Sequence, residues 1–277
     1  MSKGLGITLI TLLSIIVVAI IGGMVYVIVN GKNINFKVFS FDLNYSTKLV
    51  AESEFDVEDL DIDSSVGDVL IETNETDKVK VEIYSDHVKE YKLESIDGKI
   101  IVKFEEKNRG FSFFGKSSVI KIYVPTEYDK AIKAVMNVGD LRIANLKKSN
   151  LDVDSKVGDI KVKGIKKAKV NSTTGDVKIT NVEDLTVKAK TGDIKVEKVT
   201  KVVKIDSATG DVKIQNANIT ENSSIKSKIG DIKINNINDG VYVDAHTNIG
   251  DEKIKHNDRK AEIELKIDSE IGDIKVY

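Results

Sequence analysis

The feature that most constrains this chain is a short motif that returns at a nearly constant interval. The stretches "TTGDVKI", "KTGDIKV" and "ATGDVKI" all lie between residues 173 and 214. From Gly139 onward, successive Gly-Asp pairs are 19, 17, 17, 18, 20, 20 and 22 residues apart. A period of this size is typical of architectures built from stacked repeats. The nine pairs are Gly67-Asp68, Gly139-Asp140, Gly158-Asp159, Gly175-Asp176, Gly192-Asp193, Gly210-Asp211, Gly230-Asp231, Gly250-Asp251 and Gly272-Asp273.

Aligning the repeats on the glycine shows a column of aliphatic residues seven and five positions before it, as at Leu151 and Val153. A small residue stands three positions before the glycine and a β-branched residue one position before it. After the pair the alternation resumes, as in Ile160-Lys161-Val162. This period-two alternation predicts strands with one buried face. It assigns the residues seven, five, three and one positions before the glycine to that buried face.

Each repeat therefore predicts two short strands joined by a corner, and stacking buries faces that no single repeat could bury. We predict an all-β fold: a parallel β-solenoid of about eight to nine coils of 17–22 residues. Glycine tolerates the positive φ that a sharp corner requires, and aspartate can close its own turn by accepting a backbone N–H. The lysine that follows two residues later is expected to neutralise the aspartate column. A calcium ladder is the alternative, but the Gly-rich nonapeptide of calcium-binding β-rolls is missing, so we expect no metal.

The period fails for 72 residues between Gly67 and Gly139. This segment contains strand-like alternation around Asp97-Gly98, a strong hairpin signal, and further strand patterns at 79–84 and 119–124. We interpret it as an N-terminal cap that covers one end of the solenoid. Two roles are open for its three phenylalanines, which either fold over the solenoid end or form an exposed tip that contacts lipid or a partner. They are Phe111, Phe113 and Phe114.

The stretch from Leu5 to Val29 contains no charged residue and is long enough to cross a bilayer as a helix. A cleavable signal peptide is the competing interpretation, but its shorter apolar region and its A-x-A-like site are missing. We therefore expect a single-pass anchor that contacts the lipid bilayer through residues 5–29. Lys3 precedes the stretch whereas Lys32 and Lys37 follow it, and a difference of one charge does not decide the orientation.

These patterns divide the chain into four predicted segments. They are a transmembrane anchor at 1–31, a juxtamembrane linker at 32–54, an N-terminal coil with the inserted hairpin cap at 55–138, and the regular solenoid at 139–277.

The composition excludes several classes of function. The chain has no cysteine, which rules out disulfides, thiol catalysis and zinc-thiolate sites. A net charge of −2 gives no sign of nucleic-acid binding. The three histidines share no spacing, and the motifs of metalloproteases, serine hydrolases and phosphate-binding loops are missing. We therefore expect no enzymatic activity and no cofactor.

The C-terminal end of the repeat is less regular. The last coils break the pattern at Glu252 and Asn257, and the chain stops at "GDIKVY" without a recognisable cap. Nearby charges either blunt this strand edge, or the edge pairs with another molecule and gives a dimer or filament. These charges are Lys253, Lys255, Asp258, Arg259 and Lys260.

The motifs "SSVGDVLI", "STTGDVKI" and "SATGDVKI" resemble those of the putative-adhesin family of bacterial β-strand-repeat proteins, a domain of unknown function, over roughly residues 55–277. With an N-terminal anchor, the chain most resembles the LiaG-type proteins of Gram-positive bacteria. The resemblance implies an extracytoplasmic domain without enzymatic activity, in some cases linked to envelope stress. The family offers no established binding residues.

Two classes of function remain at this point. In the first, an anchored extracytoplasmic solenoid contacts envelope polymers, envelope proteins or another cell, with its lysine columns facing anionic polymers. In the second, the solenoid faces the cytoplasm and polymerises end to end, as bactofilin-like cytoskeletal proteins do. Membrane sidedness discriminates between them.

Overall fold

The computed structural model describes residues 48–107, 117–255 and 257–277, and these residues form strands and connections without any helix. The predicted anchor, the first part of the linker and the three phenylalanines lie outside the described residues. Among the described residues, no helix has the length and apolarity needed to cross a membrane. The strands are β1 (Leu49–Phe55), β2 (Asp59–Val66), β3 (Asp68–Asn74), β4 (Val79–Tyr84), β5 (Val88–Ile96), β6 (Lys99–Glu106), β7 (Val119–Pro125), β8 (Ala131–Val138), β9 (Leu141–Val157), β10 (Ile160–Thr174), β11 (Val177–Thr191), β12 (Ile194–Thr209), β13 (Val212–Ala217), β14 (Ser223–Ile229), β15 (Ile232–Ile237), β16 (Val241–Ile249), β17 (Glu252–Ile254), β18 (Ile263–Ile271) and β19 (Ile274–Val276).

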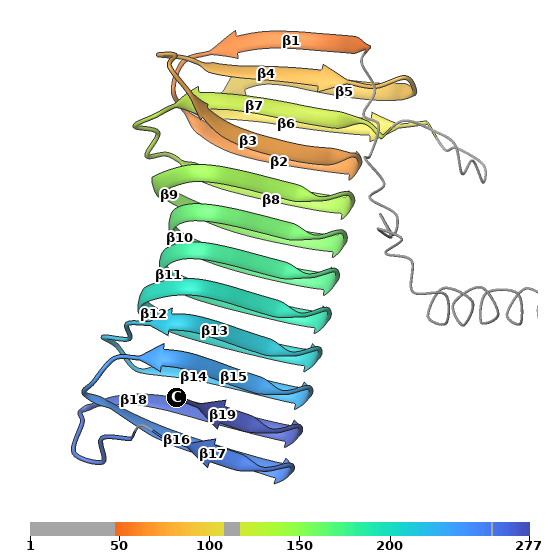
Figure 1. Ribbon diagram of the computed structural model, residues 1–277. Coiled ribbons are helices and arrows are strands. Elements are labelled where there is room, and N and C mark those ends of the chain that lie inside the picture. The colour runs from red at the N-terminus through yellow and green to blue at the C-terminus, as the bar shows by residue number, and fades with distance from the viewer. Residues whose placement is uncertain (1–47, 108–116, 256) are drawn as a thin grey trace, which may run out of the picture. The chain divides into compact units, whose positions relative to one another are not determined.

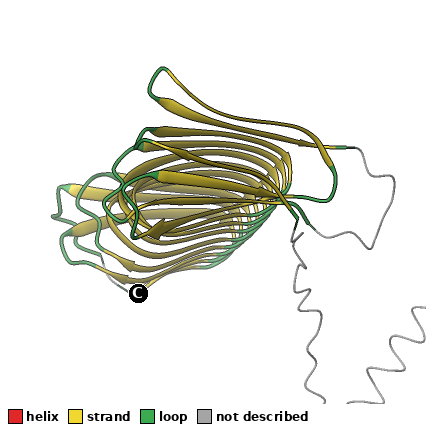
Figure 2. Ribbon diagram, turned by 90° about the horizontal axis from the view of Figure 1, so that it is seen from above, coloured by secondary structure: helices red, strands yellow, loops and turns green. Residues whose placement is uncertain are grey.

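The predicted all-β solenoid is confirmed, with most strands paired in parallel and stacked coil upon coil (Figure 1). Each coil has one strand before its Gly-Asp corner and one after it, and the two strands lie in opposite layers (Figure 2). We call these layers the pre-corner sheet and the post-corner sheet. The long strands β9 to β12 contribute to both, because each bends at a second corner. Coils stack in register, as in the pairs Val170–Val187 and Ile179–Val196.

The core between the two sheets consists almost entirely of Val, Ile and Leu side chains. The columns predicted to point inward five and seven residues before each glycine are buried, as at Val187 and Leu185, which have no exposed surface. The aliphatic residues two and four positions after the glycine are buried as well, as at Ile194 and Val196. β-branched side chains suit these stacked positions because they pack well on a pleated surface.

At the C-terminal end of the solenoid, the coils do not follow the order of the chain. Strand β18 pairs with both β14 and β16, and β19 pairs with both β15 and β17. The coil of Gly272 therefore lies between those of Gly230 and Gly250, and the C-terminus is inside the stack (Figure 1). We expected the sequence "GDIKVY" to form the open edge. That was wrong, because the edge strands are β16 and β17.

The N-terminal end shows a comparable inversion. Strands β6 and β7 pair in parallel with β2 and β3, and so form a coil beyond that of Gly67. The chain then crosses back to β8, which pairs with the other side of β2. Tyr128 holds this crossing in place, because its ring is buried and its hydroxyl donates to the carbonyl oxygen of Glu58 at 2.7 Å. Burial raises the pKa of the Tyr128 hydroxyl.

Antiparallel strands complete this end. The hairpin predicted around Asp97-Gly98 is present as β5 and β6, with positive φ at both turn residues. Strand β1 pairs antiparallel with β4. Residues 49–54, assigned to the linker from the sequence, therefore belong to the solenoid. The sequence "LVAESEF" alternates too weakly to indicate a strand by itself, and it is held by its pairing with the buried strand β4.

Side chains satisfy the backbone of the edge strand β16. The amide of Asn257 accepts the N–H of Val243 and donates to its carbonyl oxygen, both at 3.0 Å. The carboxylate of Glu252 accepts the N–H of Thr247 at 2.7 Å. These groups occupy positions that an incoming strand would need, so the two residues that break the repeat block this edge.

Candidate functional site

The nine Gly-Asp pairs form one continuous corner along the solenoid. Their glycines have φ values between +129° and +147°, a region that other residues rarely adopt. In the central coils the glycines also lie directly on one another. A Cβ added to Gly192 would be 2.2 Å from the carbonyl oxygen of Gly175. Glycine is therefore required both for its conformation and for the close approach of neighbouring coils.

The aspartates connect neighbouring coils. The Asp193 N–H donates to Oδ1 of Asp176 at 2.9 Å, and the Asp211 N–H donates to Oδ1 of Asp193 at the same distance. The series runs without interruption from Asp68 to Asp251 and follows the inverted coil order at its end. We predicted that each aspartate would close its own turn. The prediction was wrong, because the sharp corner turns each N–H toward the adjacent coil rather than toward its own side chain.

Lysines that follow the aspartates neutralise part of this column, as expected. Lys213 lies 3.1 Å from Asp211 and Lys275 lies 2.8 Å from Asp273. The N–H of the next coil and then Lys213 lower the pKa of Asp211, and the Lys275 ammonium is the main cause of the lowered pKa of Asp273. At these positions one carboxylate oxygen accepts an amide hydrogen and the other faces an ammonium.

The β-branched column before the glycines differs from the prediction. We assigned it to the buried face, but Val157 is 47% exposed and Ile249 is 65% exposed. The small residues two positions earlier are buried, as at Ser207 and Ser227. The alternation stops beyond them because the backbone is already turning toward the corner. An exposed ladder of Val, Thr and Ile therefore runs beside the glycines.

A second corner, which the sequence analysis did not identify, lies opposite the first. Its residue stands six positions after each corner glycine from Gly139 to Gly230 and has a positive φ, between 56° and 75°. Asparagine is the most frequent residue there, since it tolerates this conformation better than most. The signal was present as an asparagine or glycine in five of the six repeats. These residues are Asn145, Gly164, Asn181, Lys198, Asn216 and Asn236.

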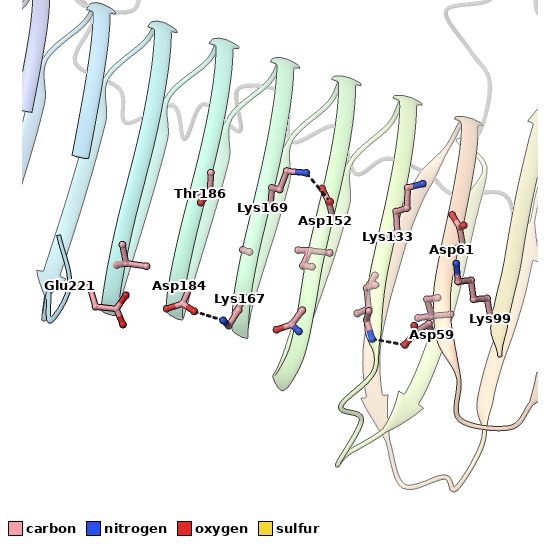
Figure 3. Close-up of a pocket in the computed structure, with 17 residues that line it drawn as sticks. Asp59, Asp61, Lys99, Lys133, Asp152, Lys167, Lys169, Asp184, Thr186 and Glu221 are labelled. Carbon is pink, nitrogen blue, oxygen red and sulfur yellow. Dashed lines mark hydrogen bonds and ion pairs between the residues drawn. The ribbon is translucent and has the colours of Figure 1, made fainter. Parts of the chain in front are cut away.

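A groove of about 600 Å³ lies on the outer face of the pre-corner sheet (Figure 3). Charges of opposite sign alternate from strand to strand across it, and two pairs of them are in contact. Lys167 lies 2.9 Å from Asp184, and Lys169 lies 2.9 Å from Asp152. The described residues that line the groove include no histidine or serine. The groove offers charged and hydrogen-bonding groups to an extended polar ligand, and no nucleophile paired with a base.

A polar cluster, in which only Glu82 is buried, lies near the N-terminal end of the post-corner sheet. Lys80 bridges Glu52 and Glu82 at 2.8 Å each, and Tyr84 donates to Glu82 at 2.8 Å. Burial alone would raise the pKa of Glu82, but the bonds from Lys80 and Tyr84 outweigh it and the pKa is lowered. Since these groups join β1 to β4, the cluster fixes the end of the sheet.

The remaining candidate residues are not brought together. In the described part of the chain, His87 and His246 lie in different end regions, and no group of three or more acidic or histidine side chains is placed to hold a metal ion. Strand β7 begins beside Asp68, at the level of the Gly67 corner, and the three phenylalanines lie outside the described residues.

Solved structures with a similar fold include a putative cell adhesion protein from Clostridium sporogenes ATCC 15579, at 17% identity and a TM-score of 0.33, with 83% of this chain and 99% of that chain covered. A putative adhesin from Bacteroides fragilis NCTC 9343 matches at 20% identity and a TM-score of 0.46, covering 84% and 98% of the two chains. A putative lipid binding protein from Parabacteroides distasonis ATCC 8503 matches at 14% identity and a TM-score of 0.40, covering 83% and 94%. Similarity at this level says nothing about function.

A search of the curated proteins finds no match. The family model for Toastrack DUF4097 matches residues 57–277, a range that begins just before β2 and includes all nine Gly-Asp pairs. The chain belongs to the Toastrack DUF4097 family.

Proposed function

We propose that this chain is a non-enzymatic, membrane-anchored scaffold whose solenoid lies outside the cytoplasmic membrane. There it contacts envelope polymers, envelope proteins or another cell through its long sides. The uncharged stretch from Leu5 to Val29 supplies the anchor in this proposal.

The observation that carries the proposal is the contrast between the ends and the sides of the solenoid. One end has antiparallel strands β1 and β5 at its edges, and at the other end Asn257 and Glu252 occupy the backbone groups of β16. The sides present columns of polar residues that repeat from coil to coil. A partner therefore has a long, regular surface along the sides, an edge blocked by side chains at the C-terminal end and antiparallel edge strands at the N-terminal end.

The same contrast disfavours the cytoskeletal alternative. Head-to-tail polymerisation that continues the parallel stack requires a free, parallel strand edge at both ends, so that the terminal coil of one molecule pairs with the first coil of the next. Here the antiparallel strands and the bonds of Asn257 interrupt that continuity.

Membrane sidedness tests the proposal. Lys166 is exposed near the second corner, and the chain has no native cysteine. In intact cells that produce the full-length Lys166→Cys variant, we expect labelling by a maleimide that cannot cross membranes. The matched variant Val170→Cys, whose side chain is buried, should stay unlabelled until denaturation. Labelling of Lys166→Cys only after lysis would overturn the proposal and favour the alternative, a cytoplasm-facing solenoid that assembles into filaments.

A further inference from the structure

Five exposed lysines gather on the outer face of the pre-corner sheet, on the adjacent strands β11, β12 and β14. We call them the lysine patch: Lys188, Lys190, Lys204, Lys226 and Lys228. Strands about 4.8 Å apart and a rise of about 3.3 Å per residue place the Cα atoms of all five lysines over an area of roughly 10 by 13 Å. Asp206 lies between Lys188 and Lys226 in the register and is the one acidic residue at the same outward positions of these three strands.

The patch keeps its positive charge. Within the described residues, none of its five lysines forms an ion pair, and on strands β11, β12 and β14 five lysines against one aspartate leave a net charge of +4 at these outward positions. On the next strand, β18, Asp268 lies beside Lys226 in the register. In the groove of Figure 3, on the same sheet, Lys167 and Lys169 pair with Asp184 and Asp152 instead.

The opposite face of the same coils makes the contrast sharper. On the post-corner sheet, Lys178 and Lys195 both face Glu197, at 3.7 and 3.1 Å, and Lys213 pairs with Asp211. In these coils the lysines of the post-corner sheet therefore have acidic partners, whereas the lysines of the patch on the pre-corner sheet do not. Unpaired lysines at this density repel one another, and a bound anion would relieve that repulsion.

The surface at the patch is also hollowed. A depression of about 460 Å³ is bordered by Lys188, Lys190 and Lys228, and Ala208 and Thr173 contribute small side chains to it. These small residues allow a ligand to approach the sheet closely while the lysines surround it.

We propose that the lysine patch binds a linear polyanion, a polymer that carries phosphodiester or carboxylate groups along its chain. The inference rests on the proposed function and names the chemistry of one envelope partner. Several ammonium groups at intervals of about 5–7 Å suit successive anionic groups of one polymer. A membrane surface fits less well, because the aspartate column beside the corner, which includes Asp193 and Asp211, would face the anionic headgroups as well.

The test uses the full-length chain in a non-ionic detergent and a fluorescently labelled inorganic polyphosphate, with binding followed by anisotropy. We expect binding that weakens as salt is raised. The triple variant Lys188→Gln, Lys190→Gln, Lys228→Gln should lose about tenfold in affinity, since three charge contacts are removed. The matched triple variant Lys178→Gln, Lys195→Gln, Lys213→Gln removes the same charge from the opposite face and should bind like the parent.

Three results would overturn the inference: no binding of polyphosphate, equal losses in both triple variants, or binding to vesicles of anionic lipid without binding to polyphosphate. Because this measurement is made on purified protein, it is independent of membrane sidedness. If the solenoid is intracellular and binds polyphosphate, the proposed function is contradicted and this inference stands. If the solenoid is extracytoplasmic and does not bind polyphosphate, this inference is contradicted and the proposed function stands.

Discussion

At the scale of the residue, two requirements meet at each Gly-Asp corner. The positive φ of the glycine excludes side chains on conformational grounds, and the carbonyl of the adjacent coil excludes them on steric grounds. Gly98 in the β5–β6 turn meets only the first requirement, because a Cβ there would have no neighbour within 4 Å. A substitution of Gly98 therefore tests backbone strain alone, whereas a substitution of a corner glycine tests strain together with steric overlap.

We expect Gly192→Ala to destabilise the solenoid by about 3 kcal/mol or more, because strain at positive φ is joined by backbone overlap across coils. Gly98→Ala should cost about 1 kcal/mol, since strain acts alone there. Urea unfolding followed by circular dichroism measures both. Similar losses at the two positions would contradict the close contact between glycines.

The aspartate column gives the molecule an acid-sensitive element. The folded-state pKa of Asp211 is lowered, so its ionised form contributes stability above the unfolded-state pKa, and that contribution is lost as pH falls through the folded-state value. Asp211→Asn keeps an oxygen that accepts the Asp231 N–H but removes the titration and the Lys213 pair. We expect the variant to be less stable than the parent at neutral pH and the difference to shrink near pH 3, by urea unfolding at both pH values. A difference that stays constant with pH would contradict this role.

Residue columns were the most predictable part of the molecule. The inward positions of Leu185 and Val187 follow from alternation alone, because a strand in a solenoid has one buried face. The exposure of Ile229 and Ile271 does not follow from alternation, since it depends on where the backbone begins to turn. The unpaired lysines were equally unpredictable, because ion pairing depends on the partners that the register places alongside.

At the scale of the element, the strands at the edges of the solenoid explain the irregular residues of the sequence. The aliphatic position two residues after the glycine is Glu252 in the Gly250 coil, and its carboxylate binds the N–H of Thr247. Asn257 performs a similar role for Val243 with both groups of its amide. A polar residue at an otherwise inward aliphatic position was therefore the signal that this coil lies at an end.

Removing the Asn257 amide should expose backbone groups of β16 to other molecules. For Asn257→Ala we expect concentration-dependent association of the full-length chain in non-ionic detergent, measured by sedimentation velocity. Glu262→Ala, in the same connection and exposed without a hydrogen bond in the described structure, is the matched control and should behave like the parent. An Asn257→Ala variant that sediments like the parent at all concentrations would show that this amide does not block the edge.

At the scale of the whole molecule, the columns of the repeat alone do not give the inverted order of the coils. The coils of Gly230, Gly250 and Gly272 share most columns, and Glu252 is the one position of the aliphatic columns after the corner that marks the Gly250 coil as different. The order depends on the connection from Lys255 to Glu262, which brings the chain back between two coils already in place. As a result the C-terminal strands have neighbours on both sides, and the exposed edge belongs to strands that a polar connection covers.

The blocked C-terminal end follows from the inverted order of the coils. This order places Ser224 beside Lys266, with Asp244 one strand further away. Strands about 4.8 Å apart allow a disulfide, whereas residues two strands apart, at about 10 Å, do not. In this cysteine-free chain we predict that Ser224→Cys with Lys266→Cys cross-links on mild oxidation and that Ser224→Cys with Asp244→Cys does not. Cross-linking of the second pair in place of the first would mean that the coils follow the order of the chain, and the account of the closed end would be wrong.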